Sequence, residues 1–494
     1  MSRTQPPAAY RETPVRGISL DSRRIQPDWL YVALPGTHTH GARFAAQAVA
    51  AGAAAILTDA EGAALAGDLG VPVWAVDDPR AQMAEAAAQI YGYPARDMAM
   101  YGVTGTAGKT MTVALLAAGL SAAGQNVGTV GTLGFSLGGR ALEADTTTIT
   151  TPEAPDLQAL LAEMDRAGAT CVAMEVSSHA LALHRVDGIE FEVSGFTNLG
   201  HDHLDFHGDQ EHYYRAKARL FEPGRSGCAV VNVDDPWGRR LAGDLDAAGQ
   251  TVVTTALDSP ADYRVTKWAP DATGATGVWM RTPSGRIECT VGMAGEFSVR
   301  NALTAAAMID QSRFDLADAL PGFARAAAPG RMQRVELGQG APLVVVDFAH
   351  TPEEVRAALQ ALPGRRIAVL GCGGDRDPGK RAPMGRAAAE LADVVVVTDD
   401  NPRDEDPAAI RAAVLEGARQ AARDSGASVL DGGDRAGAIA LALSRAHPGD
   451  TVAILGKGHE TGQQIGDRIV SFDDVAVARE QWLKTGGAAQ GEEN

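Results

Sequence analysis

Cysteine is scarce in this 494-residue chain, and its scarcity excludes the structures that depend on it. The four cysteines lie far apart, and none belongs to a C-x-x-C pair: Cys171, Cys228, Cys289 and Cys372. We therefore expect neither a disulfide framework nor a cysteine-based zinc site. This cysteine usage favours a reducing cytoplasm as the compartment.

Long apolar runs are missing as well. A helix that crosses a membrane needs about 18 or more consecutive apolar residues, and the sequence has no such run. The first residues, Met1-Ser-Arg-Thr-Gln-Pro-Pro, lack the apolar core of a signal peptide. We expect no membrane span and no secretory leader.

Basic residues are outnumbered by acidic ones. The chain has 44 Lys and Arg against 62 Asp and Glu, which gives a net charge of −18. This balance argues against a broad nucleic-acid surface, which needs a basic face. It leaves room for a small anionic ligand, because a few local groups can make a positive site. The length predicts about three domains.

The sequence is organised around a glycine-rich stretch at residues 101–110. Residues 98–101 predict the end of a strand, and residues 111–120 predict a helix. The turn between them ends in Gly108-Lys109-Thr110. Such a turn points backbone N–H groups at a phosphate, with the helix N-terminus behind it. Lys109 is then predicted to reach the β- and γ-phosphates, and Thr110 to bind Mg²⁺.

The strict phosphate-loop pattern G-x-x-x-x-G-K-[ST] is not met, because Val103 stands where the pattern requires glycine. The alternative is a glycine-rich strand–helix turn with an accidental Gly-Lys-Thr. The required order of strand, turn and helix favours the phosphate interpretation.

The first 95 residues alternate short strands with alanine-rich helices, which predicts a small α/β domain. We expect strands at residues 29–34, 54–58 and 71–76, and a helix at residues 43–51. Two polar stretches, residues 21–24 and 36–41, are each as consistent with a ligand loop as with a solvated turn.

An acidic residue, Glu175, lies near the end of a predicted buried parallel strand at residues 171–176. That edge of an open α/β sheet is where ligands bind. A Mg²⁺ ion beside a triphosphate would satisfy a buried acid there, and a capping or ion-paired acid is the equal alternative. The hydroxyl-rich residues 146–152 predict at least a helix cap.

One loop, residues 197–208, gathers histidines and aspartates: His201, Asp202, His203, Asp205 and His207. The His-x-His-x-x-x-His spacing matches no zinc pattern, so a phosphate–Mg²⁺ site is favoured over structural zinc. A helix is predicted at residues 209–221, and its Lys217 reads, from the sequence alone, as an exposed helix charge.

A third α/β unit is predicted from residue 330 onward. Its strands are expected at residues 342–347, 366–371, 392–398 and 450–455. A polar cluster follows each strand: His350, Gly373-Gly-Asp-Arg-Asp377, Asp399-Asp-Asn-Pro-Arg403 and Gly456-Lys-Gly-His-Glu460. Since the carboxyl ends of parallel strands form the ligand-binding edge, we expect a site there.

Together these motifs resemble those of the Mur ligases, the ATP-dependent amide-bond-forming enzymes of peptidoglycan precursor synthesis. The resemblance extends from residue 20 to residue 460, and it is strongest to the branch that adds the third peptide residue. It rests on Leu20-Asp-Ser-Arg23, Gly105-Thr-Ala-Gly-Lys-Thr110, Ala173-Met-Glu-Val-Ser-Ser-His179, Asp202-His-Leu-Asp205, Gly330-Arg-Met332, Asp347-Phe-Ala-His-Thr-Pro352, Asp399-Asp-Asn-Pro-Arg403 and Gly456-Lys-Gly-His-Glu460.

The resemblance implies three α/β domains. Residues 1–97 would form a small N-terminal UDP-binding domain, with Ser22 and the loop at residues 36–41, including His40, as contacts. Residues 98–329 would form a central ATP-binding domain with a P-loop ATPase-like, mostly parallel sheet. Residues 330–494 would form a Rossmann-like amino-acid-binding domain. A monomer is expected.

The resemblance also implies ATP and Mg²⁺ as cofactors. It assigns ATP binding to Gly105, Thr106, Ala107, Gly108, Lys109, Thr110, Asn301, Arg331, Asp347 and His350. The last three would close over the nucleotide from the third domain. Mg²⁺ would be held by Thr110 and Glu175, a second Mg²⁺ would lie near His203, and a carbamylated Lys217 would be a further Mg²⁺ ligand. One departure is Ser298, where the family usually has asparagine.

Two further sets of residues match the family's substrate contacts. Thr150, Thr151, Ser177 and Arg185 would hold UDP-MurNAc-L-Ala-D-Glu, and Asp400, Asn401, Arg403, Gly456 and Glu460 would hold meso-diaminopimelate. Arg403 can grip the distal carboxylate of diaminopimelate bidentately, whereas lysine offers none. The alternatives are a lysine-adding ligase of the same family, a folylpolyglutamate-type ligase, and a non-enzymatic P-loop switch.

Overall fold

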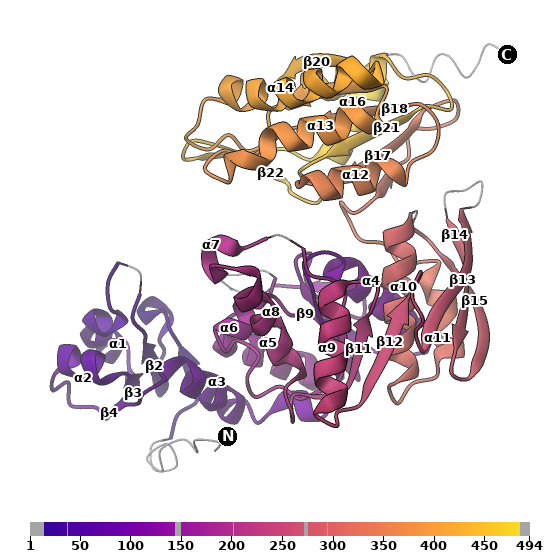
Figure 1. Cartoon of the computed structure of the whole chain (residues 1–494). Helices are drawn as coiled ribbons and strands as arrows, with labels where there is room; N and C mark the ends of the chain where they lie inside the picture. Colours follow the sequence, from indigo (N-terminus) through magenta and orange to yellow (C-terminus); the bar gives the residue numbers. More distant parts are fainter. Residues whose placement is uncertain are drawn as a thin grey trace. The chain divides into compact units, whose positions relative to one another are not determined.

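A computed structural model describes residues 14–36, 38–143, 150–200, 202–270, 275–293 and 295–484. The chain divides into two compact units, which are described separately (Figure 1). The first comprises Met1–Lys267, Trp279–Cys289 and Arg300–Phe323, and the second comprises Trp268–Val278, Thr290–Val299 and Ala324–Asn494. Thr37, His201, residues 144–149 and the tail from residue 485 lie outside the described residues, as does the side chain of Asp205.

The N-terminal part of the first unit is a four-stranded parallel sheet in the order β1-β2-β3-β4. The predicted strands are confirmed, with ends shifted by two residues or fewer. The predicted helix at residues 43–51 begins instead as a 3₁₀ helix, Gly41–Phe44, because His40 caps it. The elements are β1 (Gly17–Ser19), β2 (Trp29–Ala33), α1 (Ala45–Ala50), β3 (Ala53–Thr58), α2 (Ala60–Ala66), β4 (Val73–Ala75) and α3 (Pro79–Ile90).

An eleven-stranded sheet follows, in the order β15-β14-β13-β12-β11-β10-β5-β9-β6-β7-β8. Its strands are β5 (Ala99–Thr104), β6 (Val127–Gly131), β7 (Gly134–Leu137), β8 (Arg140–Leu142), β9 (Cys171–Glu175), β10 (Phe191–Phe196), β11 (Ser226–Asn232), β12 (Val252–Ala256), β13 (Tyr263–Pro270), β14 (Thr276–Thr282) and β15 (Gly285–Val291). Pairing is parallel from β12 to β6. The chain runs from β5 to one side and returns on the other at β10, so a topological switch point lies between these two strands.

Helices cover this sheet (Figure 1). They are α4 (Lys109–Ala122), α5 (Ala154–Arg166), α6 (Ser178–Ala182), α7 (Leu204–His207), α8 (Gln210–Ala218), α9 (Pro236–Ala247), α10 (Glu296–Asp310) and α11 (Leu316–Phe323). The helix predicted at residues 209–221 is α8 followed by a 3₁₀ turn, and the Asp209 side chain caps it by accepting from the backbone N–H of His212.

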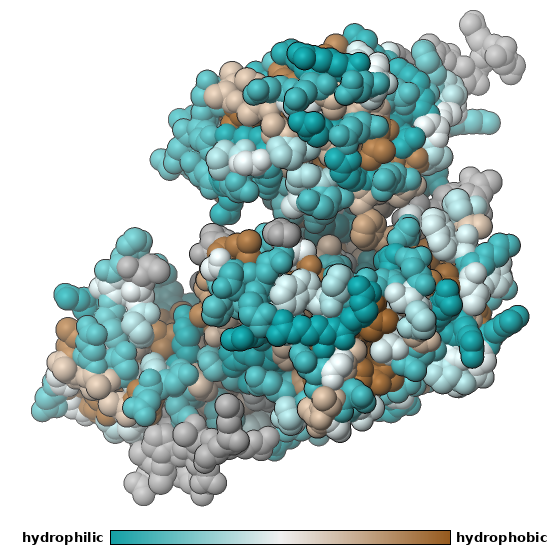
Figure 2. All heavy atoms as spheres, viewed as in Figure 1, coloured by the Kyte–Doolittle hydropathy of each residue, from teal (hydrophilic) through white to brown (hydrophobic). Residues whose placement is uncertain are grey.

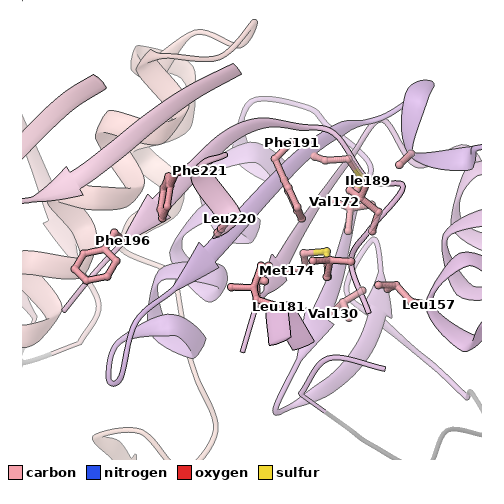
Figure 3. Close-up of a cluster of buried hydrophobic side chains, with 14 of the residues drawn as sticks. Val130, Leu157, Val172, Met174, Leu181, Ile189, Phe191, Phe196, Leu220 and Phe221 are labelled. Carbon is pink, nitrogen blue, oxygen red and sulfur yellow. The ribbon is translucent and has the colours of Figure 1, made fainter. Parts of the chain in front are cut away.

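The core of this region is formed by side chains of the strands that pack against side chains of the covering helices. Val172 and Met174 on β9 pack with Leu181 of α6 in one fully buried cluster (Figure 3). Parallel strands covered on both faces read as continuous apolar runs, which is why residues 171–176 were predictable as a strand. Burial of each such side chain contributes about 1.5–3 kcal/mol.

The second unit contains a six-stranded sheet in the order β16-β17-β21-β18-β19-β20, parallel except at β16. The four predicted strands are confirmed. Its elements are β16 (Gln333–Val335), β17 (Leu343–Asp347), α12 (Pro352–Gln360), β18 (Arg366–Leu370), α13 (Arg381–Leu391), β19 (Val394–Thr398), α14 (Pro407–Ser425), β20 (Ser428–Gly433), α15 (Arg435–Ser444), β21 (Thr451–Leu455), the hairpin β22 (Gly462–Ile465) and β23 (Arg468–Ser471), and α16 (Asp474–Lys484).

The predicted α/β class with mostly parallel sheets is therefore confirmed, while the domain boundaries at residues 97 and 329 stay predictions. In the part of the chain that the structure describes, no helix combines the length and apolarity that a membrane crossing requires. On the face shown in Figure 2, hydrophilic residues predominate and the hydrophobic ones form separate spots.

A buried ion pair joins two helices of the second unit. Arg435 opens α15 and is fully buried, and its Nε and Nη2 each lie 2.7 Å from a carboxylate oxygen of Asp474 at the start of α16. Burial disfavours the charged guanidinium, but Asp474 outweighs this effect and raises the pKa of Arg435. The pair therefore keeps a charge inside the protein.

We predict that Asp474→Asn lowers the free energy of unfolding by about 3–5 kcal/mol, because removing one partner leaves a buried charge uncompensated. Urea unfolding followed by circular dichroism measures this change. The control is Glu480→Gln, which removes an exposed pair with Lys484 and should change stability by about 0.5 kcal/mol or less. Equal effects of the two substitutions would contradict the prediction.

Candidate active site

The predicted phosphate loop is the turn between β5 and α4. Gly105 and Gly108 have positive φ angles of 151° and 91°. A Cβ on Gly105 would lie 1.9 Å from Thr197 Oγ1, and one on Gly108 would lie 2.5 Å from Asn301 Oδ1. Glycine is therefore required at both positions, for conformation and for space. The structure also brings Asn301, a predicted nucleotide contact, against this turn.

The segment after β10 holds the loop in shape. Asn198 Oδ1 accepts from the backbone N–H of Ala107 at 3.0 Å, and its Nδ2 donates to the Ala107 carbonyl at 3.1 Å. Thr197 Oγ1 donates to the same carbonyl at 2.6 Å. Thr197 and Asn198 reach the loop because they follow β10, and β10 pairs with β5, the strand that precedes the loop, at the switch point. Asn198 was not among the residues predicted from the sequence, although its place two residues after the apolar strand β10 was a usable signal.

Two lysines converge on one carbonyl oxygen of the loop. Lys109 Nζ donates to the Gly105 oxygen at 2.9 Å and to the Thr106 oxygen at 2.9 Å. Lys217 Nζ, from α8, donates to the same Gly105 oxygen at 2.8 Å. Lys217 is only 1% exposed, so its interpretation as an exposed helix charge is wrong.

The electrostatics of Lys217 follow from this position. Burial lowers its pKa well below the ordinary value, and the nearby Lys109 charge lowers it further, while Asp202 acts in the opposite direction. A lysine with a depressed pKa carries a neutral, nucleophilic amine for part of the time. The Lys217 ammonium also lies 4.5 Å from the centre of the Tyr213 ring.

Glu175 and Thr110 supply oxygen atoms at the same edge of the sheet. Glu175 ends β9 opposite Val103 of β5 and is 1% exposed. Its Oε1 accepts from the Thr132 N–H at 2.8 Å and its Oε2 from the Thr132 hydroxyl at 3.2 Å. Thr110 lies in the first turn of α4. A carboxylate and a hydroxyl are ligands that suit Mg²⁺, so this donor set fits the ion that the resemblance implies.

The histidine-rich loop lies beside these groups. His203 precedes α7 with a φ of 53° and is partly exposed, and its Nε2 lies 3.4 Å from Asp202 Oδ2. Its ring is 4.8 Å from that of His179. His207 Nε2 lies 2.9 Å from Ser178 Oγ. Among the described residues, no three His, Cys, Asp or Glu side chains are grouped so that they could hold a metal ion.

The residues predicted to hold the muramoyl-dipeptide meet at the end of β9. Thr151 Oγ1 donates to the Glu175 carbonyl at 2.9 Å and accepts from the Ser177 N–H at 3.2 Å. Ser177 caps α6, and Thr150 Oγ1 lies 3.2 Å from Thr132 Oγ1. An open pocket adjoins this region, lined by Ala182, Phe206, His207, His212, Arg215, Ala216, Ala218, Arg219 and Glu222.

Arg185 is held by Glu153, which was not among the residues predicted from the sequence. Glu153 Oε1 accepts from Arg185 Nε at 3.0 Å and Nη2 at 2.7 Å, and Arg185 Nη1 donates to the Thr151 carbonyl at 3.1 Å. The second oxygen of Glu153 accepts from Arg80 at 3.2 Å. Glu153 thus fixes the guanidinium of Arg185 relative to both α3 and α5.

The two predicted uridine contacts are both engaged in local hydrogen bonds. Ser22 Oγ donates to Gln47 Oε1 at 3.3 Å. His40 Nδ1 accepts from the Ala42 N–H at 3.0 Å, and its Nε2 lies 3.1 Å from Asp59 Oδ1.

In the second unit, Asp347 ends β17 and anchors the next loop. Its two oxygens accept from the backbone N–H groups of Met332 and Ala349 at 2.7 and 2.8 Å. Burial raises its pKa, and the charge of Arg331 opposes that rise. The Arg331 guanidinium lies 4.5 Å from the Phe348 ring centre. The predicted nucleotide contacts of this unit are thus grouped.

His350, the third of these contacts, is paired with Glu354. Its Nδ1 lies 3.1 Å from Glu354 Oε2. Burial favours the neutral imidazole, but the hydrogen bond to Glu354 outweighs it and raises the pKa of His350. The same bond lowers the pKa of Glu354 to about 2, against the effect of its burial. His350 is therefore biased toward its charged form.

The predicted diaminopimelate residues lie together at the carboxyl ends of β19 and β21. Asn401 Nδ2 donates to Glu460 Oε2 at 2.9 Å, and the fully buried Lys457 donates to both Glu460 Oε2 and Asn401 Oδ1. Arg403 has a φ of 52° and its Nη1 donates to the Gly374 carbonyl at 2.5 Å. Lys457 was not among the predicted site residues, although it lies inside a predicted motif.

Asp400 and Gly456, the other two predicted diaminopimelate residues, are in contact with each other. A Cβ on Gly456 would lie 2.6 Å from Asp400 Oδ2, and the φ of Gly456 is 115°. Arg435 Nη1 lies 3.8 Å from the same carboxylate oxygen. The cluster combines a carboxylate, an amide and a guanidinium, which can bind a zwitterionic amino-acid head.

Comparison with known proteins identifies the family of this chain. The family descriptions "Mur ligase family, catalytic domain", "Mur ligase middle domain" and "Mur ligase, glutamate ligase domain" match residues 14–91, 103–309 and 330–458. The UDP-N-acetylmuramoyl-L-alanyl-D-glutamate--2,6-diaminopimelate ligase of Streptomyces avermitilis is 46% identical over 97% of this chain and 94% of that protein. The protein of the same name from Corynebacterium glutamicum is 46% identical over 96% and 93%.

Solved structures agree in fold. A structure of a UDP-N-acetylmuramoyl-L-alanyl-D-glutamate--2,6-diaminopimelate ligase matches with a TM-score of 0.69 and 32% identity, covering 98% of this chain and 97% of that one. A Mycobacterium tuberculosis folylpolyglutamate synthase matches with a TM-score of 0.61 and 21% identity, covering 76% of this chain and 91% of that one. The latter likeness is one of fold alone. The chain belongs to the Mur ligase family.

Proposed function

We propose that the chain is an ATP-dependent ligase that joins meso-diaminopimelate to the γ-carboxylate of D-glutamate in UDP-MurNAc-L-Ala-D-Glu. The observation that carries this proposal is the cluster of Asn401, Arg403 and Glu460, in a chain that also has a two-lysine phosphate loop. The names of its relatives, which cover nearly the whole chain, support the same substrates. The reaction extends a peptidoglycan precursor, and we place it in the cytoplasm.

The phosphate loop supports ATP as the energy source. The N-terminus of α4 and the N–H groups of residues 105–110 favour bound phosphate. Lys109 leaves its carbonyl partners for the β- and γ-phosphates when ATP binds, because an ammonium interacts more strongly with a phosphate anion than with neutral carbonyls. Its charge then stabilises the transferring phosphoryl group.

The chemistry proceeds in two displacements. An oxygen of the D-Glu γ-carboxylate attacks the γ-phosphorus, the bond from that phosphorus to the β,γ-bridging oxygen breaks, and ADP leaves with that electron pair. The amine of diaminopimelate then attacks the carbonyl carbon of the acyl phosphate. The bond from that carbon to the phosphate oxygen breaks, inorganic phosphate leaves, and the nitrogen loses a proton. No protein side chain becomes covalently attached to the substrate.

Mg²⁺ would be held by Thr110, Glu175, His203 and Lys217 in carbamylated form, and it would withdraw charge from the phosphate oxygens. The depressed pKa of Lys217 supports the carbamate, because only the neutral amine adds CO₂. The ammonium first loses one proton, and the amine loses a second when it adds CO₂, so the carbamate places an anion where the Lys217 cation would stand. Glu175 is held ready for this role by its two hydrogen bonds from Thr132.

Arg403 favours diaminopimelate over lysine. A guanidinium has five N–H donors, and one hydrogen bond to the Gly374 carbonyl leaves others for the distal carboxylate. Glu460 can pair with the distal ammonium. L-lysine lacks that carboxylate and would leave the arginine poorly satisfied. A folylpolyglutamate-type ligase would not need this cluster, which makes that alternative weaker.

The test is ATP-dependent phosphate release with UDP-MurNAc-L-Ala-D-Glu and either meso-diaminopimelate or L-lysine. We expect turnover with diaminopimelate only. Arg403→Ala should lower kcat/KM for diaminopimelate by about 10- to 100-fold, because charge-assisted hydrogen bonds are lost. The control is Arg423→Ala, an exposed residue in the last turn of α14, which should leave kcat/KM unchanged.

Two outcomes would contradict this proposal in different ways. Turnover with L-lysine and not with diaminopimelate would agree with a ligase reaction, but it would overturn the role of Arg403 in selecting diaminopimelate. If neither amino acid supports phosphate release, the substrate assignment is overturned, and folate-type substrates should be tested next.

The role of Lys217 has its own test. Lys217→Arg keeps the positive charge but cannot form the carbamate, so we expect at least a 100-fold loss of kcat, as when a group that acts on developing charge is removed. The matched control is Lys484→Arg at an exposed site. Activity of Lys217→Arg close to that of the control would show that Lys217 acts as a cation.

A further inference from the structure

The hairpin β22–β23 holds the loop that carries the predicted diaminopimelate residues. Gln464 uses its backbone for this: its N–H donates to Asn401 Oδ1 at 2.9 Å, and its carbonyl accepts from the Arg403 N–H at 3.2 Å. The Gly466 N–H donates to the Arg403 carbonyl at 2.8 Å. Arg403 and Ile465 form a parallel β-bridge. The loop therefore lies against the hairpin almost as a third strand.

One side chain of the hairpin also reaches the loop. The Nε2 of Gln463 donates to the backbone carbonyl of Asp400, and Gln463 is only 8% exposed. This bond fixes the residue that immediately precedes Asn401. The next side chain, Gln464, makes its contact within the hairpin, with the Gly466 carbonyl at 3.4 Å.

The hairpin holds the loop in a conformation that is unfavourable without support. Arg403 has a φ of 52°, in the left-handed region, which costs a non-glycine residue about 1 kcal/mol or more. Surrounding hydrogen bonds must offset that cost. On both sides of Arg403 these bonds come from the hairpin, and they aim its side chain toward Gly374.

We infer that Gln463 is a positioning residue that sets the selectivity for the amino-acid substrate by fixing the loop Asp400–Asn401–Pro402–Arg403. This inference rests on the proposed function. Gln463 acts through the backbone of Asp400 and has no role in phosphoryl transfer. A misplacement of about 1 Å in a binding group is enough to weaken recognition strongly. The loss should therefore fall on diaminopimelate and leave ATP and the UDP-linked substrate unaffected.

The test compares Gln463→Met with Gln464→Met. Methionine keeps the length of the glutamine side chain and removes its N–H donors. For Gln463→Met we expect KM for meso-diaminopimelate to rise about tenfold, the size expected for one lost hydrogen bond and a loosened partner, with KM for ATP unchanged. The inhibition constant of L-lysine as a competitor should stay unchanged, so the binding preference for diaminopimelate over L-lysine should fall by the same factor. Gln464→Met should match the wild type, because its loop contacts are made by the backbone.

A second variant, Gln463→Glu, and thermal unfolding of each variant separate positioning from loss of folding. Gln463→Glu retains size and polarity but loses the donated N–H, so KM for diaminopimelate should rise again. An unchanged KM for diaminopimelate in both Gln463 variants would overturn the inference, as would a parallel rise in KM for ATP. If the wild-type chain does not use diaminopimelate at all, the proposed function fails instead, which distinguishes the two failures.

Discussion

The carbonyl oxygen of Gly105 accepts hydrogen bonds from two ammonium groups, those of the half-buried Lys109 and the buried Lys217, and the proposed chemistry of the first unit depends on this contact. A neutral carbonyl carries only a partial negative charge, so it cannot balance two cations in a site of low dielectric. Burial is the main cause of the depressed pKa of Lys217, and the nearby charge of Lys109 lowers that pKa further. The site gains electrostatic stability when it receives phosphate oxygens. The fold creates the contact because Lys109 opens α4 directly after the loop and α8 brings Lys217 to the same loop.

In the proposed function, the second unit recognises an amino acid that is charged at both ends. Its polar groups stand at the carboxyl ends of β17, β19 and β21, where a parallel sheet leaves backbone and side chains open to a ligand. The buried cations Arg435 and Lys457 have permanent partners, which are the carboxylates of Asp474 and Glu460. The hairpin β22–β23 adds a template for the loop that ends in Arg403. In the proposed function, rigidity of this kind is what distinguishes two similar diamino acids.

The sequence was sufficient for the parallel strands and for most site motifs, because continuous apolar runs and the polar residues that follow them are local patterns. It was insufficient where a residue's role depends on a distant partner. Lys217 looks like a surface charge on its own helix, and only the meeting of α8 with the phosphate loop buries it. Asn198, Glu153 and Gln463 are ordinary polar residues in sequence, and each acts through a contact with a segment more than twenty residues away.

In the proposed reaction, the γ-carboxylate of D-Glu is activated by phosphoryl transfer at the two-lysine loop. The most direct measurement uses UDP-MurNAc-L-Ala-D-Glu labelled with oxygen-18 in that carboxylate, followed by mass analysis of the inorganic phosphate released during turnover with ATP and meso-diaminopimelate. The acyl phosphate route moves one labelled oxygen into each phosphate. Phosphate free of the label, in a reaction that still forms the amide, would contradict the account.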